Sequence, residues 1–381
     1  MARQRSKWDW AGLPPELVTI IGKKVTTNTE YTRLRSVCKA WRRALSPYTR
    51  HLPRQAPWLM VPINALGREG HEDIAELVFY DRFRSKTHRF RLPYISGKHI
   101  CGCSHGWLIL EHDRKVSVFN PITQISIYPP PFDAPPTHLN QIFFVEKAIL
   151  SCNPYEDGCI IVVGFKFQNT HLPTHKELRF CRIGDTHWTG LKTLNEPGKL
   201  LDFTCHKKFI YTISKKGEVS GYDTQDQSVR TFPSKIKYRP SYGRYSPFRD
   251  EINLLEGDSE SNEPLVVKYT LKDNTLERSK ITVYKWFGDM QNWYQVFNKG
   301  KRVIFFNEEH SINLQVEEGP EKRQENELYN YVTRKVGKEI AFAGINLVYF
   351  KSGMVVLQKP RTIEELVTGS GCPMWITPSL I

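Results

Sequence analysis

The stretch SHGWLILEHDRKVSVFNPITQISIY, residues 104–128, indicates the fold class of this chain. It contains three short runs of strand-forming residues, 107–110, 116–119 and 125–128, in which apolar side chains dominate. The segments between these runs, HDRK and NPIT, are rich in the charged, Asn and Pro residues that are typical of turns. This alternation predicts an antiparallel meander of short strands.

The same succession of strand, turn and strand returns at residues 209–222 and 347–357. Six opening residues of the most apolar runs are spaced by 53, 49, 56, 38 and 44 residues, with a mean of 48; they are Trp107, Ile160, Phe209, Leu265, Val303 and Leu347. Blades of β-propellers repeat at roughly 40–50 residues, and closing a ring removes exposed sheet edges. We therefore predict an all-β propeller-like domain of about six irregular blades, with tandem sandwiches as the alternative.

Before residue 47 the apolar residues recur with a helical period instead. The spacing from Leu13 to Ile21, with two prolines where a first turn tolerates them, predicts a short helix over about 14–21. A second apolar stripe predicts one continuous helix that Pro47 ends; its members are Leu34, Val37, Cys38, Trp41 and Leu45. The chain is thus predicted to have an α+β multidomain fold, with a small helical element before the β domain.

The positive charge of the chain is concentrated in its first residues. Of the 54 Lys and Arg residues that give a net charge of +14, twelve lie in residues 1–54, where only Asp9, Glu16 and Glu30 oppose them. This segment carries +9, and the remaining 42 basic and 37 acidic residues leave only +5 for the rest of the chain. Any acidic partner is therefore expected to bind near the N-terminal helices.

The composition excludes several classes of protein. Apolar runs such as residues 159–163 are far shorter than the roughly 20 residues that cross a bilayer, and residues 1–5 begin no apolar signal core. The eight cysteines follow no framework spacing, so we expect reduced thiols. An intracellular protein of the nucleus or cytoplasm, or both, is the expectation.

Catalytic and metal-binding patterns are weak. Cys101, Cys103 and His105 offer three ligands on what we expect to be one strand face, but no second cluster completes a zinc site. Cys152 and Cys159 bracket a turn, which we interpret as the ends of two strands rather than a redox pair. No phosphate-binding loop, dinucleotide fingerprint or nucleophile elbow occurs. We predict a non-catalytic protein with no metal site and no cofactor.

Two parts of the chain resemble known families. Residues 8–17, WDWAGLPPEL, and 34–42, LRSVCKAWR, resemble the start and the end of an F-box. The remainder is similar to plant F-box proteins with a KIB-type β-propeller, and the segments that carry this similarity are SHGWL (104–108), FNPIT (119–123), GINLVYF (344–350) and MWITPSL (374–380). The resemblance implies a three-helix F-box over residues 8–47 and a KIB-type propeller over residues 48–375.

What the F-box resemblance implies is a substrate-recognition subunit of an SCF-type cullin–RING E3 ubiquitin ligase. The F-box would bind a Skp-type adaptor, and through it a cullin, while the propeller binds an unidentified protein target. The resemblance places nine residues at or beneath the adaptor interface: Leu13, Pro14, Glu16, Leu17, Ile20, Leu34, Val37, Cys38 and Trp41. Trp41 is the expected main anchor, because Trp is prominent among interface hot spots. Arg35, Lys39 and Arg42 are expected to steer the F-box toward an acidic adaptor.

Two other interpretations of the basic helices stay open. An apolar stripe with arginines on its other side is, in most proteins, an ordinary core helix with a solvated face. The basic segment is also compatible with a nucleic-acid-binding or regulatory scaffold protein without a ligase role. No zinc-finger spacing, recognition-helix motif or RNA-binding aromatic signature supports nucleic-acid binding, so this function ranks second. Neither a membrane nor a nucleic acid is the predicted partner.

Overall fold

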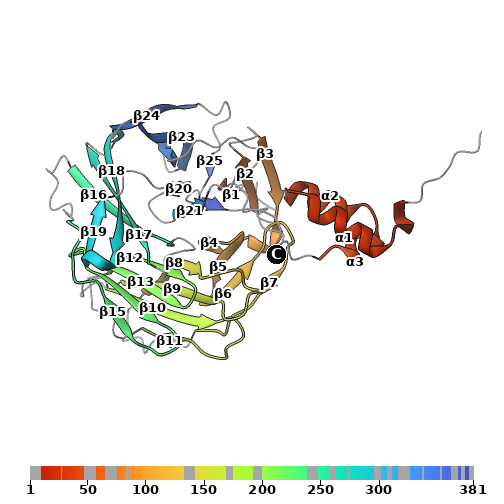
Figure 1. The fold of residues 1–381 in the computed structure, drawn as a ribbon, viewed down its shortest axis with the longest axis horizontal. Helices are drawn as coiled ribbons and strands as arrows, with labels where there is room; N and C mark the ends of the chain where they lie inside the picture. Colours follow the sequence, from red (N-terminus) through yellow and green to blue (C-terminus); the bar gives the residue numbers. More distant parts are fainter. Residues whose placement is uncertain are drawn as a thin grey trace, which may run out of the picture.

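The structure is a computed structural model in which β-sheets form a ring and three helices lie outside it (Figure 1). It describes residues 10–26, 28–46, 57–64, 75–81, 86–132, 142–168, 175–191, 200–237, 248–257, 263–272, 275–295, 302–306, 311–315, 327–336, 339–351, 354–361, 368–369 and 374–376. Within these ranges, none of the helices has both the length and the apolar character needed to span a bilayer. The limits 8–47 and 48–375 of the two domains stay predictions.

The helical element consists of three α-helices, preceded by one short 3-10 helix. They are η1 (Trp10–Gly12), α1 (Pro15–Lys24), α2 (Asn28–Ser36) and α3 (Lys39–Ala44). The predicted first helix is confirmed and extends to Lys24, where Lys23 and Lys24 suit the negative end of the helix dipole.

The predicted continuous helix through residues 34–45 is wrong, because the chain leaves the helical conformation at Val37. Cys38 has extended backbone angles, φ −159° and ψ 173°, and starts α3 as its N-cap residue. Its sulfur accepts a hydrogen bond from the backbone N–H of Trp41 at 3.4 Å. Ser, Thr, Asp or Asn usually fills this role, so the sequence carried no standard capping signal at this break.

Six sheets form the ring, and we number them as blades in chain order. Blade 1 contains β26 (Met374–Ile376), β1 (Trp58–Asn64), β2 (Ala75–Asp81) and β3 (Lys86–Arg91). Blade 2 contains β4 (His99–Ser104), β5 (Trp107–His112), β6 (Lys115–Phe119) and β7 (Ser126–Ile127), preceded by η2 (Pro93–Ile95). Blade 3 contains β8 (Ile142–Leu150), β9 (Ile160–Gln168), β10 (His175–Arg182) and β11 (Thr189–Gly190).

The second half of the ring is less regular. Blade 4 contains β12 (Leu200–His206), β13 (Phe209–Ser214), β14 (Val219–Asp223) and β15 (Val229–Thr231). Blade 5 contains β16 (Phe248–Leu255), β17 (Leu265–Lys272), β18 (Thr275–Phe287) and β19 (Asn292–Gln295), with η4 (Gly288–Met290) between the last two. Blade 6 has six strands: β20 (Arg302–Phe306), β21 (Ser311–Gln315), β22 (Glu327–Val336), β23 (Glu339–Lys351), β24 (Met354–Arg361) and β25 (Thr368–Gly369). Blades 1 to 5 are wholly antiparallel, whereas β20 and β22 of blade 6 run parallel.

The ring closes through a strand from the far end of the chain. β26 pairs with β1, and Trp58, Leu59 and Met60 lie opposite Ile376, Trp375 and Met374. The inner strands of successive blades are neighbours, as β26 contacts β4, β4 contacts β8, β8 contacts β12, β12 contacts β16 and β16 contacts β21. Contact between β25 and β1 joins blade 6 to blade 1. The expected propeller with about six irregular blades is therefore confirmed.

The spacing argument gave the right blade number for partly wrong reasons. Trp107, Ile160, Phe209 and Leu265 each open the second strand of blades 2 to 5. The other two landmarks, at residues 303 and 347, both lie in blade 6, and no landmark marked blade 1. The count of six therefore combined one blade counted twice with one blade missed.

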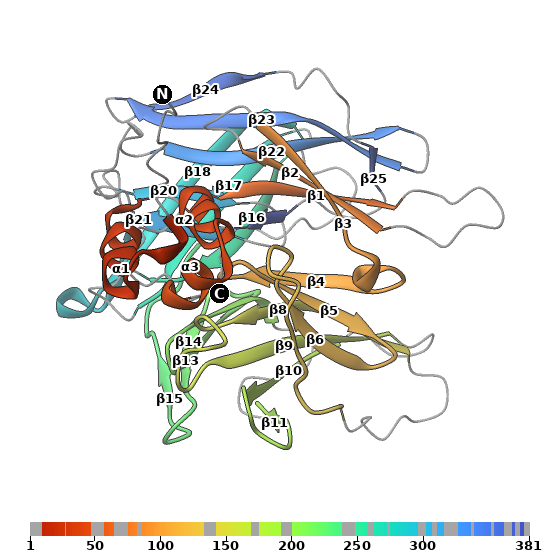
Figure 2. The same ribbon diagram turned by 90° about the vertical axis from the view of Figure 1, so that its right-hand side faces the viewer.

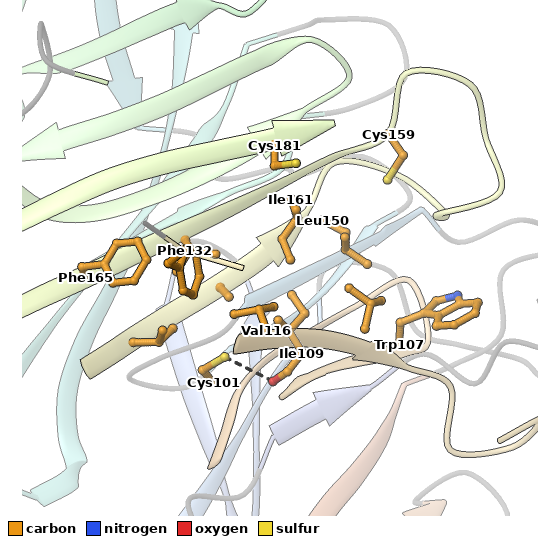
Figure 3. Close-up of a cluster of buried hydrophobic side chains, with 14 residues drawn as sticks. Cys101, Trp107, Ile109, Val116, Phe132, Leu150, Cys159, Ile161, Phe165 and Cys181 are labelled. Atoms are coloured by element: carbon orange, nitrogen blue, oxygen red, sulfur yellow. Dashed lines mark hydrogen bonds between the residues drawn. The ribbon is translucent and has the colours of Figure 1, made fainter. Parts of the chain in front are cut away.

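The apolar core lies between neighbouring blades. Figure 3 shows the cluster between blades 2 and 3, in which Trp107, Ile109 and Ile161 are fully buried. Similar clusters lie between blades 1 and 2, 3 and 4, and 4 and 5. Close approach at the inner strands requires glycine, because a Cβ atom on Gly102 would lie 1.8 Å from the carbonyl oxygen of Ala148 in the next blade.

The cysteines of β4 do not share a strand face as expected. The register of β4 against β5 shifts between Ile100 and Gly102. As a result Cys101 joins the cluster between blades 2 and 3, whereas Cys103 joins the cluster between blades 1 and 2. Among the described residues, no group of three His, Cys, Asp or Glu side chains is arranged to hold a metal ion.

A buried ion pair ties three blades together near their inner strands. Lys147 of β8 lies 2.6 Å from Asp202 of β12, and both side chains are almost buried, with 13% and 10% of their area exposed. The second carboxylate oxygen of Asp202 accepts the N–H of Leu254 in β16 at 2.8 Å. Lys147 also donates to the carbonyl of Phe203 at 3.0 Å. This network satisfies both charges, as buried ions require.

Candidate functional site

The three helices have a small core of their own. Four of their side chains are buried together: Val18 of α1, Tyr31 of α2, Trp41 of α3, and Leu45 directly after α3. Six further residues of the element pack on them and are partly buried: Leu13, Ile21, Val25, Leu34, Cys38 and Ala44. The helical element therefore has an interior that its own side chains complete.

Close contacts hold the helices at fixed positions around this core. The Tyr31 hydroxyl donates to the carbonyl of Ser46 at 2.9 Å, and burial raises the pKa of Tyr31. Gly22 of α1 faces Leu45, and a Cβ atom at this position would lie 2.4 Å from a methyl group of Leu45. A residue larger than glycine would thus push α1 away from the end of α3.

Trp41 is a core residue of the helical element. Only 4% of its area is exposed, and its indole N–H donates to the carbonyl of Trp10 at 2.7 Å. This bond fixes η1 against α3. Trp41 therefore lies beneath the surface of the helices, and its role as the main anchor of the adaptor interface stays a prediction. Its position beneath the surface agrees with a supporting role.

Large apolar side chains remain exposed on the same helical element. Trp10 is 62% exposed, Leu17 47%, Ile20 51% and Val37 52%. Eleven large apolar residues are exposed in the described part of the chain, so these four residues of 10–46 are a concentration in a small segment. Leu17 and Ile20 stand three residues apart on α1, on the side away from Val18, and therefore share one outward face.

The other predicted interface residues occupy three kinds of position. Pro14 and Glu16 are exposed at the start of α1, beside the exposed face of that helix. Leu13, Leu34 and Cys38 are partly buried against the helical core. The nine predicted residues thus divide into an exposed set, Pro14, Glu16, Leu17, Ile20 and Val37, and a supporting set, Leu13, Leu34, Cys38 and Trp41. The exposed Trp10 was not among the predicted contacts, although it stands in the quoted WDWAG segment.

The predicted steering residues are partly engaged with the helices themselves. Lys39 and Arg42 are exposed, whereas Arg35 is partly buried. The guanidinium of Arg42 donates to the backbone carbonyl of Arg35 at 3.3 Å, which bridges the break between α2 and α3. Lys39 and Arg42 thus keep positive charge at the surface close to exposed Val37 in sequence.

A turn of blade 2 supports the helical element. Ile122, between β6 and β7, packs against the helical core. Its turn is rigid because the fully buried Asn120 side chain accepts the N–H groups of Ile122 and Thr123 at 2.9 and 3.0 Å. Pro121 follows Asn120 and restricts the backbone further. The FNPIT segment therefore presents an apolar contact to the helices, which the sequence pattern had indicated only as a turn.

Most of the exposed large apolar residues that the structure describes in the propeller lie on one face. Turns of neighbouring blades meet there: the rings of Trp107 and Tyr155 lie 5.8 Å apart, and Arg182 donates to the carbonyl of Thr224. We call this side the turn face, because it holds the turns β4–β5, β6–β7, β8–β9, β10–β11, β12–β13, β14–β15, β16–β17 and β18–β19. Exposed large apolar residues on or beside these turns are Tyr155, Val229, Phe287, Met290 and Tyr294. Figure 2 views the ring from its side, with the helices next to blades 1 and 2.

These features define a β-propeller protein with an N-terminal three-helix element that has a complete core and an exposed apolar surface. The chain belongs to the KIB1-4 beta-propeller family, which its sequence matches over residues 78–338. It is also similar to an Arabidopsis thaliana protein named "Putative F-box protein At5g55150", with 21% identity over 316 residues that cover 78% of each chain. The resemblance that the sequence motifs indicated is thereby confirmed.

Solved structures match this chain only at low similarity. A complex of KlAtg21 with the coiled coil of AgAtg16 is 10% identical, with 80% of this chain and 82% of that chain covered and a TM-score of 0.36. An oligogalacturonate lyase in complex with manganese is 7% identical, with 78% and 77% covered and a TM-score of 0.38. Likeness at this level supports no argument about function.

Proposed function

We propose that this protein is a substrate-recognition subunit of an SCF-type cullin–RING E3 ubiquitin ligase. Its three helices would bind a Skp-type adaptor, and through it a cullin, while the propeller binds the protein to be ubiquitinated. The observation that carries the proposal is the exposed apolar set of the helical element. Leu17, Ile20 and Val37 stay about half exposed although the helices already have a complete core.

Exposed aliphatic residues of this size are unfavourable in water unless another surface covers them. The propeller leaves them exposed and contacts the helices through Ile122 instead. A second protein is therefore the partner that we propose for this surface. The surrounding positive charge of residues 1–54 favours an acidic partner and would raise the rate of association more than the final affinity.

The propeller's role in this proposal is to hold the target. Its turn face offers exposed Tyr155, Phe287, Met290 and Tyr294, and turns on a rigid scaffold can vary without disturbing the core. The contact between Ile122 and the helical core would keep the adaptor-binding element in a defined position relative to this face. We propose no catalytic step of ubiquitin transfer for the chain itself, since the partner subunits would carry out that reaction.

Reconstitution of the complex tests the proposal. The full chain is mixed with a purified Skp-type adaptor and analysed by size-exclusion chromatography with light scattering. An equimolar complex that also retains a cullin N-terminal region supports the proposed role. Failure to retain the adaptor at micromolar concentrations, by a chain with native far-ultraviolet circular dichroism, contradicts it. A gel shift with duplex DNA at physiological salt runs in parallel, and specific binding there would favour the nucleic-acid alternative.

A further inference from the structure

Cys152 and Cys159 face each other across the turn between β8 and β9. The strand register pairs Leu150 with Ile161, and the same register places Cys152 opposite Cys159 two residues further on. The N–H of Ser151 donates to the carbonyl of Ile160 at 3.0 Å, whereas the N–H of Cys159 donates to Glu156 inside the turn. Cys152 and Cys159 are therefore a pair without mutual backbone hydrogen bonds.

This type of pair suits a disulfide. In antiparallel strands the Cα atoms of such pairs lie about 4.5 Å apart, closer than in hydrogen-bonded pairs. Disulfides need Cα separations of roughly 4.4–6.8 Å. The register of β8 and β9, continued by two residues beyond their paired ends, would bring the Cα atoms of Cys152 and Cys159 within this range.

The two thiols already interact and have different surroundings. The Cys159 thiol donates a hydrogen bond to the backbone carbonyl oxygen of Cys152 at 3.2 Å. The neighbouring Cys159 thiol lowers the pKa of Cys152, whereas the neighbouring Cys152 and burial raise the pKa of Cys159. Cys152 is partly exposed, whereas only 1% of Cys159 is exposed. The pair thus combines a partly exposed thiol of lowered pKa with a buried neighbouring thiol.

The two cysteines do follow β8 and precede β9, as the sequence indicated. In contrast to our interpretation of the sequence alone, we propose that Cys152 and Cys159 form an oxidant-responsive dithiol that glutathione disulfide converts to an intramolecular disulfide. The Cys152 thiolate attacks one sulfur of glutathione disulfide, which forms a mixed disulfide and releases one glutathione thiolate. The released glutathione thiolate accepts the proton of Cys159, and Cys159 attacks the Cys152 sulfur, which releases the second glutathione thiolate. Both cysteine sulfurs are oxidised, and one glutathione disulfide is reduced to two molecules of glutathione.

The other described cysteines lack this combination of features. Burial raises the pKa of Cys103 and that of Cys181 to about 12, and burial also raises the pKa of Cys205. Buried thiols with a raised pKa react slowly, because the thiolate is the nucleophile. Cys38 is partly buried and caps α3, and no second cysteine stands near it in the helical element. It serves as a matched control for a single thiol.

The disulfide would act on the turn face of the propeller. It closes the turn of residues 153–158, in which the exposed Tyr155 contacts Trp107 of blade 2. Oxidation would hold this turn in place and keep Tyr155 at the boundary between blades 2 and 3. This inference concerns chemistry of the chain alone, so it does not depend on the proposed ligase role.

Peptide mapping of the oxidised full chain tests the inference. The reduced protein is incubated with glutathione disulfide, alkylated, and cleaved beside Glu156 or Asp157, which separates Cys152 from Cys159. The expected result is a pair of peptides that stay linked until a reductant is added, with an intact mass lower by two hydrogens. Linkage of Cys152 to Cys205, or a stable mixed disulfide on Cys152 in the unaltered chain, would overturn the inference.

Three variants make the assignment of roles specific. Cys159→Ser should stop at the mixed disulfide on Cys152, and Cys152→Ser should leave Cys159 as a free thiol. Cys38→Ser should form the internal bridge as fast as the unaltered chain. If Cys159→Ser and Cys152→Ser formed bridges equally, or added glutathione equally, the result would contradict the proposed roles of the two thiols. Thermal unfolding of each variant verifies its fold, and mapping of the unaltered chain tests the bridge even if a variant fails to fold.

Discussion

Replacing Leu17 and Ile20 together by alanine should weaken binding of a Skp-type adaptor without unfolding the helices. Complete burial of one such side chain contributes roughly 1.5–3 kcal/mol. In the free protein Leu17 is 47% and Ile20 51% exposed, so a partner can cover only about half of each. Covering that half contributes about 1 kcal/mol per residue, and the double variant should lose about 2 kcal/mol, or roughly thirty-fold in Kd.

Isothermal titration of the adaptor into the full chain measures this loss directly. Met290→Ala is the matched control, because Met290 is 64% exposed but lies on blade 5. Its Kd should stay within a factor of two of the unaltered value. The free energy of unfolding of the Leu17 and Ile20 double variant should fall by less than about 2 kcal/mol, because neither residue belongs to the buried core. An unchanged adaptor Kd in a natively folded double variant would refute the assignment of this surface.

Three further predictions follow from buried or shifted groups. Trp41→Ala should cost about 3–5 kcal/mol by leaving a cavity in the helical core, and loss of helical circular dichroism would reveal it. Lys147→Met should cost about 3–5 kcal/mol in urea unfolding because it leaves Asp202 buried and unpaired, whereas Lys147→Met with Asp202→Leu should cost less. For Tyr94, burial raises the pKa, but hydrogen bonds from neighbouring side chains outweigh it and lower the pKa to about 8. This value is below the unfolded pKa of 10.0, so the Tyr94 phenolate should stabilise the folded chain. The contribution should be fully present above pH 10 and should be lost as the pH falls through about 8. Ultraviolet titration of the unaltered chain against Tyr94→Phe measures the phenolate.

The sequence located most of the propeller because central strands have a distinctive composition. Trp107, Ile160, Phe209 and Leu265 open strands that lie between two other strands of their blade and pack on both faces. Such strands appear in the sequence as continuous apolar runs. Blade 1 was not found this way, and its inner strand β26 comes from the far end of the chain, whereas β1, β2 and β3 are consecutive. The parallel pairing within blade 6 likewise joins runs that look like separate repeats.

The helical site was predicted in composition but not in orientation. An apolar stripe through Leu34, Cys38 and Trp41 indicated a core, and these residues do pack together. The stripe could not show that the chain breaks at Val37, because a cysteine sulfur caps α3. Apolar residues on both sides of α1 were the clearest signal available for a second surface, since Val18 is buried while Leu17 is exposed.

The support of the helices by blade 2 was not predictable from the residues near them in sequence. Ile122 stands about a hundred residues away and lies in a turn whose Asn and Pro suggested only a change of chain direction. Periodicity reports the faces of one element, whereas a contact between distant elements depends on the closed ring. The FNPIT segment thus had a packing role that only the structure shows.

Pairing of β26 with β1 has a consequence for biosynthesis. During translation, β1 leaves the ribosome among the first strands, but its partner on the inner side of the blade is synthesised almost last. Until residues 374–376 emerge, a nascent chain has an unsatisfied strand edge that can pair with other polypeptides. A frameshift or nonsense allele that removes only this short segment should therefore yield a product prone to aggregation and to clearance by quality control, even though nearly all of the coding sequence is intact.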